Sequence, residues 1–168
     1  MTNQMPVGKA LLFLIPIGAY ILLYVALLSL LGLSQPIWLG FILLWYWGME
    51  KMASFDAVVK TIFPGALTGI AAAYLLHTLP QLFGTVGTGI AFALVAFLVL
   101  CTLTKWLKMF VNGATFLLVT ILSVPAIAET ANYLEYIGVV VATSIFIGAT
   151  AWLVNRLESR SKELPANQ

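Results

Sequence analysis

The ionisable residues of this chain lie between its apolar stretches and not within them. Only 8% of the 168 residues are charged, against about 25% in a typical soluble domain. No Asp, Glu, Lys, Arg or His stands near the middle of any long apolar stretch. Proton relays, ion-coupled transport and acid–base catalysis inside a membrane depend on such groups. We therefore expect no catalytic residue, and we do not expect an enzyme.

Metal, cofactor and nucleic-acid chemistry are equally absent from the sequence pattern. The single cysteine, Cys101, lies in an apolar run, and one cysteine with one histidine does not make a metal site. No Gly-rich nucleotide loop is present. The basic residues form no stripe that could follow a phosphate backbone. We expect no cofactor, no metal and no nucleic-acid partner.

Neutral polar and aromatic side chains are the remaining candidates for contact with a solute. Asn112 is the most costly of them to expose to lipid, because its amide needs several hydrogen-bond partners. A helix–helix hydrogen bond and a solute contact both account for it. Trp45 and Tyr46 fit either an inward constriction or an interfacial aromatic belt. The candidates for substrate or pore contact are Asn112, Thr115, Thr68, Trp45, Tyr46, Phe63 and Phe110.

Charged residues at the ends of the apolar stretches are candidates for the two mouths of a path. At the inner mouth these are Glu50, Lys51 and Lys108, although the first two also fit snorkelling at the lipid surface. At the outer mouth they are His77, Glu129 and Glu135. A histidine beside carboxylates can titrate between about pH 5 and 8, so an acid-sensitive gate and an ordinary hydrated loop both remain open.

The elements that must position these residues are apolar helices. Hydrophobic residues make up 62% of the chain, and a helix crosses a bilayer with roughly 20 apolar residues. Charges and turn formers divide the chain into six apolar stretches. The second, 36–49, is short for a span, so either its helix continues past Glu50 and Lys51 or the bilayer thins around it. We predict an all-α polytopic membrane protein with one six-helix domain over 1–155 and a polar cytoplasmic tail over 156–168. The predicted helices cover 10–33, 36–49, 61–79, 82–104, 110–128 and 136–154.

The placement of positive charge gives this topology an orientation. With the N-terminus in the cytoplasm, all 8 Lys and Arg residues fall on the cytoplasmic side. The opposite loops contain only His77, Glu129 and Glu135 as titratable groups. We therefore predict that both termini are cytoplasmic.

Small residues and a weak internal similarity suggest how the helices pack. Gly65, Gly69 and Ala73 follow one another at a spacing of four, which places them on one helix face suited to close packing, within the chain or between subunits. Segments 61–66 and 109–114 resemble each other after a one-residue gap. Such a similarity is typical of a parallel repeat of helix hairpins, as found in transporters.

Two motifs resemble those of the YcdZ-like bacterial inner-membrane proteins, a family of unknown function. They are Trp38-Leu39-Gly40-Phe41 and the segment 110–116, in a chain of similarly small size. Where the family pattern has Phe-Val-Pro-Gly-Thr-Phe, this chain carries Asn112 and Ala114, whereas 63–65 keeps Phe-Pro-Gly. The resemblance implies a bacterial cytoplasmic membrane and supplies neither a substrate nor a catalytic residue.

Together these features predict a membrane channel or facilitator for a small polar or weakly acidic solute. Its expected partners are the lipid bilayer, the solute and further copies of itself in a homo-oligomer. The alternative is a structural or accessory subunit that packs against a larger membrane protein through the face of Gly65, Gly69 and Ala73.

Overall fold

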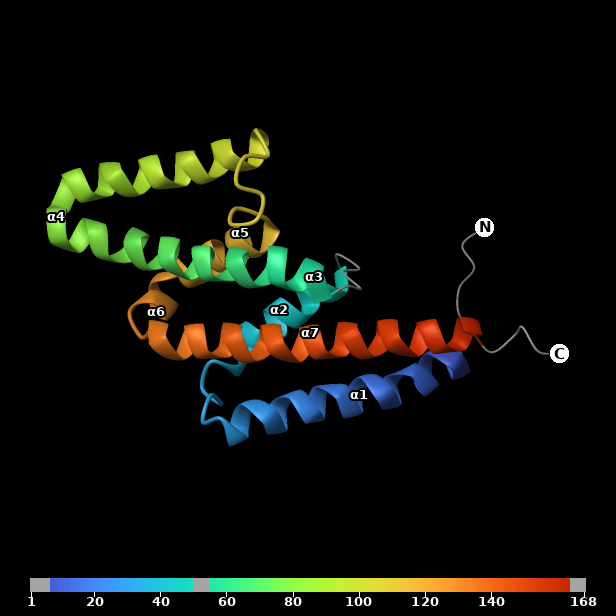
Figure 1. Cartoon of the computed structure of the whole chain (residues 1–168). Coiled ribbons are helices and arrows are strands. Elements are labelled where there is room, and N and C mark those ends of the chain that lie inside the picture. The colour runs from blue at the N-terminus through green and yellow to red at the C-terminus, as the bar shows by residue number, and fades with distance from the viewer. Residues whose placement is uncertain (1–6, 50–54, 164–168) are drawn as a thin grey trace.

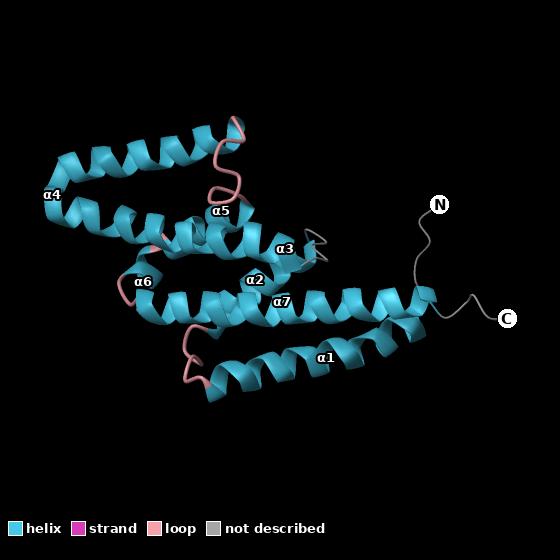
Figure 2. Ribbon diagram, viewed as in Figure 1, coloured by secondary structure: helices cyan, strands magenta, loops and turns pink. Residues whose placement is uncertain are grey.

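The chain folds into helices joined by turns. The computed structural model describes residues 7–49 and 55–163, and this part of the chain contains no strand (Figure 2). The predicted all-α class is confirmed. Glu50 and Lys51 lie outside the described residues. The elements are α1 (Val7–Leu30), α2 (Ile37–Met49), α3 (Phe55–Ala57), a π-helical turn (Val58–Ile62), α4 (Phe63–Leu103), α5 (Gly113–Leu122), α6 (Pro125–Ala128) and α7 (Tyr133–Glu163).

Helix α4 folds back on itself at Gly84. This residue has φ 56° and ψ −129°, a conformation that glycine adopts without the steric cost of a side chain. Its two arms, residues 63–83 and 85–103, run in opposite directions (Figure 1). A side chain at Gly87 would collide with the backbone of Leu79, so the arms meet closely at the reversal. The sequence predicts the reversal at Pro80, but this proline is accommodated inside the first arm.

The fifth apolar stretch is interrupted. A continuous helix over 110–128 is the wrong prediction, because α5 ends at Leu122 and α6 begins at Pro125. Pro125 has no N–H to donate to a carbonyl one turn earlier. The residue before a proline also avoids the helical region, and Val124 is extended at φ −64° and ψ 123°.

Helix α7 is longer than predicted. It continues to Glu163, past the predicted end at 154 and into the segment expected to be a polar tail. The Ser159 hydroxyl donates to the Asn155 carbonyl at 2.9 Å, and the Arg156 guanidinium lies 5.1 Å from the centre of the Trp152 ring. Charged helix formers thus extend the apolar helix beyond its hydrophobic part.

Two groups of buried side chains hold the helices together. The larger, here called the main core, joins α1, α2, α7, the π-helical turn, the first arm of α4 and α5. Fully buried members include Tyr24, Leu28, Leu39, Leu43 and Ile147. The smaller, here called the α4–α5 seam, joins both arms of α4 to α5 and contains Ala72, Leu98, Cys101, Val111 and Val119.

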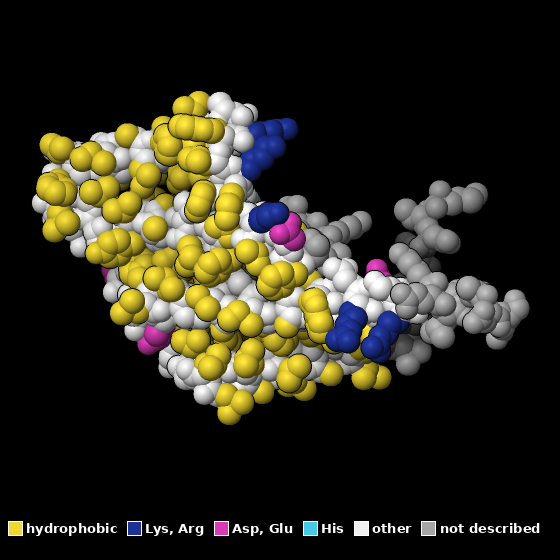
Figure 3. Space-filling model, viewed as in Figure 1, with side chains coloured by type: hydrophobic (Ala, Val, Ile, Leu, Met, Phe, Trp, Pro, Cys, Tyr) yellow, Lys and Arg dark blue, Asp and Glu magenta, His cyan; other side chains and the backbone are white. Residues whose placement is uncertain are grey.

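The outer surface is strongly apolar. Large hydrophobic side chains such as Leu22, Leu82, Phe92 and Leu134 are more than 70% exposed, and hydrophobic atoms dominate the face seen in Figure 3. Among the residues that the structure describes, two helices are long and apolar enough to cross a membrane, Phe55–Leu103 and Tyr133–Arg160. Shorter apolar helices cover Leu14–Leu30, Ile37–Met49 and Gly113–Leu122. The structure therefore shows membrane-crossing length for two helices and not for all six predicted spans.

Candidate functional site

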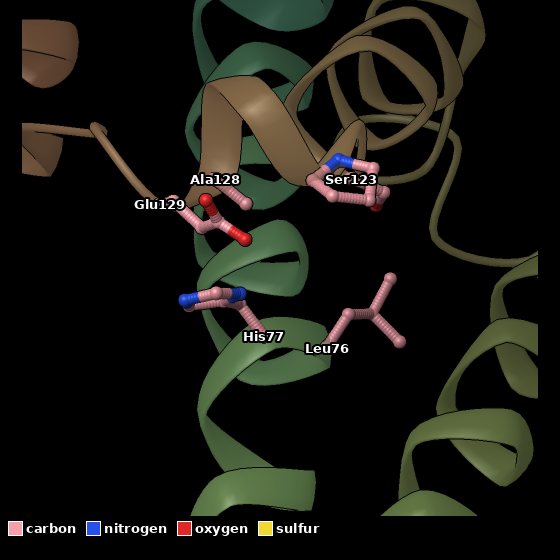
Figure 4. A pocket seen from close by; sticks show the side chains of 6 residues that line it. Leu76, His77, Ser123, Ala128 and Glu129 are labelled. Carbon is pink, nitrogen blue, oxygen red and sulfur yellow. The ribbon is translucent and has the colours of Figure 1, made fainter.

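A pocket of about 270 Å³ lies where the first arm of α4 meets the interruption between α5 and α6. Figure 4 shows the side chains of His77, from α4, and Glu129, from the end of α6, projecting into the same space. The pocket is lined by Leu76, His77, Ser123, Pro125, Ala128 and Glu129. Two of the three predicted outer-mouth residues are thus brought together.

The local sequence explains why a pocket forms here. Ser123 is the C-terminal cap of α5, and the extended Val124 separates it from Pro125, the first residue of α6. Glu129 caps the other end of this short helix. The break in the helix therefore brings Ser123, Pro125 and Glu129 to the wall of the same pocket.

The pocket combines one carboxylate, one imidazole and one hydroxyl. His77 Nε2 lies 3.0 Å from the Gln81 amide nitrogen, one turn further along α4. No group of three potential metal ligands exists among the described residues. The arrangement can hydrogen-bond a small polar molecule.

The third outer-mouth candidate, Glu135, lies in a different pocket. Its carboxylate accepts a hydrogen bond from the Asn132 side chain at 2.8 Å, at the start of α7. This second pocket measures about 220 Å³ and is lined by Gln35, Pro36, Trp38, Thr130, Asn132, Glu135 and Tyr136. The structure therefore divides the acidic outer residues between two sites.

Asn112 joins the start of α5 to the chain just before α4. Its side-chain amide donates to the Thr61 carbonyl at 2.8 Å and, at 3.3 Å and 3.2 Å, to the Lys108 and Met109 carbonyls. Its side-chain oxygen accepts from the Ala114 N–H at 3.0 Å, capping α5. Of the two interpretations open from the sequence, the structure favours the helix–helix contact, since both ends of the side chain are engaged.

The hydroxyls predicted to contact a solute also bond within the chain. Thr115 is fully buried and donates to the Phe110 carbonyl at 2.7 Å. Thr68 donates to the Pro64 carbonyl one turn earlier, at 2.9 Å. Neither the Thr115 nor the Thr68 hydroxyl therefore has its proton free for a solute in this conformation.

Lys108, the third predicted inner-mouth residue, lies exposed in the segment before α5.

The aromatic candidates are distributed over several environments. Trp45 is 62% exposed and lies on the face of α2 opposite to the buried Leu39, Gly40 and Leu43. Within this chain it therefore does not point into the helix bundle. Tyr46 is partly buried and approaches Gly113, where a side chain would collide with its ring. Phe63 packs partly against the main core, and Phe110 is 46% exposed.

The small-residue face of the first α4 arm is occupied within the chain. Gly65, Gly69 and Ala73 are all buried. A side chain at Gly65 would collide with the Asn112 amide, and one at Gly69 would meet the Thr115 backbone and Leu118. This face packs on α5, so the partner surface expected for an accessory subunit is already filled.

Sequence reasoning missed two tyrosines that link α1 to α7. The Tyr24 hydroxyl lies 2.7 Å from the Thr143 hydroxyl in a fully buried contact, and the Tyr20 hydroxyl lies 3.3 Å from that of Thr150. Gly40 makes room for Tyr24, because a side chain there would overlap its phenol ring. The spacing of these two tyrosines, four residues apart within an apolar stretch, could have predicted this contact, because a buried tyrosine hydroxyl usually finds a hydrogen-bond partner.

Comparison with protein-family models, curated proteins and solved structures finds no match for this chain. The resemblance to the YcdZ-like proteins therefore stays a prediction.

Proposed function

We propose that this chain crosses a bacterial cytoplasmic membrane six times with both ends in the cytoplasm. Successive segments run in alternating directions: α1, α2, the two arms of α4, the interrupted α5–α6 pair and α7 (Figure 1). The start of α1 and the end of α7 lie at the same end of the bundle. The Lys and Arg side chains visible in Figure 3 gather toward that end, as a cytoplasmic surface requires.

Within that topology, the protein acts as a facilitator for a small, uncharged polar solute. The observation that carries this proposal is the interruption between α5 and α6, which opens onto a pocket containing Ser123, His77 and Glu129. Discontinuous helices whose unpaired backbone and polar side chains line a cavity are a recurring basis of solute sites in transporters. The pocket lies within one protomer, so a homo-oligomer is not needed to complete it.

Below the pocket, the α4–α5 seam closes the path. Leu76 both lines the pocket and packs against the seam, whose buried members include Leu98 and Val119. Hydrophobic constrictions of this kind exclude water until the helices separate. The structure is therefore interpreted as a conformation open to the outside and closed toward the cytoplasm.

The charge of Glu129 defines which solutes enter. A carboxylate repels anions, so a weak acid would enter in its neutral form, and neutral hydrogen-bonding molecules such as urea are favoured. The Ser123 hydroxyl and the His77 ring supply hydrogen-bond partners for such molecules.

Proteoliposome flux measurements with urea and acetate test this function. We expect urea flux above that of protein-free vesicles, and acetate uptake that rises as the external pH falls toward the acetate pKa. Glu129→Gln should raise uptake of the acetate anion several-fold. Glu135→Gln is the matched control, because it removes the same charge from the same end of the protein but from the other pocket.

Two results would count against the proposal. One is urea and acetate flux equal to that of empty vesicles. The other is an identical response of acetate uptake to Glu129→Gln and Glu135→Gln, which would mean that outer surface charge, and not the pocket, controls entry.

A further inference from the structure

Two apolar grooves flank the π-helical turn at the proposed cytoplasmic end of the molecule. The larger, about 500 Å³, lies between the start of α4 and the segment before α5, and it is lined by Val59, Phe63, Pro64, Leu67, Thr68, Ala71, Met109 and Phe110. The smaller, about 310 Å³, lies against α7 and is lined by Phe55, Val58, Val59, Phe63, Val141, Ser144 and Ile145. Val59 and Phe63 belong to both, so the grooves run on either side of one ridge.

The linings present hydrocarbon to any occupant. In the larger groove the Thr68 hydroxyl donates to the Pro64 carbonyl. In the smaller groove the Ser144 oxygen is enclosed and has no hydrogen-bond partner. Five of the side chains that form the walls, Phe55, Val59, Val141, Ile145 and Phe110, are 37–65% exposed. The occupants best suited to these grooves are therefore acyl chains.

The length of the larger groove matches one leaflet of a bilayer. Its wall runs along the helix from Val59 to Ala71, which at about 1.5 Å per residue is roughly 18 Å. Half of a hydrocarbon core about 30 Å thick is roughly 15 Å. A chain entering at the cytoplasmic surface would end near Ala71.

Positively charged residues stand next in the chain to residues that line the grooves. Lys60 lies on the π-helical turn between Val59 and Phe63, and Lys108 directly precedes Met109. Asn112 holds the two segments together, since its amide bonds both the Thr61 and the Lys108 carbonyls. Asp56 opposes this charge, because its carboxylate accepts from the Lys60 ammonium at 2.7 Å.

From this arrangement we infer a specific site for an anionic diacyl phospholipid of the cytoplasmic leaflet. One acyl chain occupies each groove, the Val59–Phe63 ridge lies between them, and the phosphate lies near Lys60 and Lys108. Basic pockets between transmembrane helices on the cytoplasmic side bind acidic head groups in this way. The inference rests on the proposed membrane orientation and not on the identity of the solute.

Native mass spectrometry of the full-length protein in detergent tests the site directly. The probe is an equal mixture of phosphatidylglycerol and phosphatidylcholine with identical chains. We expect a several-fold preference for phosphatidylglycerol in the first bound lipid. Lys60→Gln with Lys108→Gln should remove the preference, whereas Asp56→Asn should increase it, because Lys60 is then released to the phosphate.

Two further variants separate the head group from the chains. Ala71→Trp fills the deep end of the larger groove and should reduce binding of both lipids about equally; Ala71 is exposed, so the substitution is compatible with folding. Arg156→Gln with Arg160→Gln is the matched control, since it removes two positive charges near the end of α7, from residues that line neither groove. This control should leave the preference unchanged.

Equal binding of the two lipids to the wild-type protein would rule out the site. So would an equal loss of preference in the Lys60/Lys108 and Arg156/Arg160 double variants, because the preference would then come from the overall positive charge of the surface. Unchanged lipid binding in Ala71→Trp would rule out the groove. Because lipid binding is read without any flux, these outcomes are independent of the response of solute uptake to Glu129→Gln.

Discussion

The main core and the α4–α5 seam are packed in different ways. The main core contains large, fully buried side chains and is tied across helices by the Tyr24–Thr143 hydrogen bond. The seam contains five buried residues, of which the second α4 arm supplies Leu98 and Cys101, with the partly buried Leu94 packed against the cluster. Along that arm, Ile90, Phe92, Phe97 and Leu103 are exposed. The first region fixes the scaffold, while the second holds one arm to it through few contacts.

This difference indicates which part of the molecule moves. Local opening is easiest where few apolar contacts and few cross-helix hydrogen bonds must break. The seam meets that description, and it adjoins the pocket of His77 and Glu129 through Leu76, which lines the pocket and packs against the seam. Movement of the second arm would open the proposed path without disturbing α1, α2 or α7.

Truncating one leucine in each region is the strongest test of the contrast. Leu43→Ala removes a fully buried side chain from the main core, and we expect it to lower the free energy of unfolding by about 2–5 kcal/mol. Leu98→Ala should instead cause local loss of amide hydrogen-exchange protection over residues 85–103, with α7 unaffected. Equal loss of protection throughout the protein in both variants would show that the two regions unfold as one unit.

Removing Asn112 should have the next largest effect. Asn112→Ala eliminates the α5 cap and the bonds to the Thr61, Lys108 and Met109 carbonyls, so we expect a loss of about 2–3 kcal/mol. Asn132→Ala is the control: it removes an exposed asparagine that precedes another helix and should cost less than about 1 kcal/mol. Chemical denaturation in detergent measures both. Similar costs for the two variants would contradict the role of Asn112 as a cross-helix clamp.

The smallest expected effect comes from the tyrosine hydroxyls. Tyr24→Phe removes one buried hydrogen bond to Thr143 and should lower the free energy of unfolding by about 1 kcal/mol. Tyr20→Phe should cost less, because its 3.3 Å contact is longer and only partly buried. Denaturation curves compared with that of the wild type measure both losses. A larger loss of unfolding free energy in Tyr20→Phe than in Tyr24→Phe would show that the main hydrogen bond between α1 and α7 is the one to Thr150.

The sequence predicts the helices better than their interruptions. Apolar length and flanking charge place α1 and α2 within a few residues. The pattern places the turn at Pro80 and not at Gly84, because proline and glycine both mark turns and only the backbone angles distinguish them. The break at Pro125 was missed, since the residues around it remain apolar and hydrophobicity alone continues the helix.

The sequence predicts the residues of the candidate site but not which of them lie together. Charge placement grouped His77, Glu129 and Glu135 at one end of the protein, but it could not show that only the first two share a pocket. The cost of exposing the Asn112 amide to lipid predicts that this side chain is hydrogen-bonded, but it does not identify the partner. The partner, Thr61, lies 51 residues earlier and becomes evident only in three dimensions.

The reversal at Gly84 also has a consequence for biosynthesis. Between Lys60 and Lys105 the chain contains no Asp, Glu, Lys or Arg, and its two arms are joined by a single glycine without a loop. In the proposed orientation the lysines at both ends stay in the cytoplasm, so no lysine, arginine or acidic side chain has to be carried across the membrane. The two arms can therefore enter the bilayer together as one hairpin during synthesis, with Gly84 as its leading point.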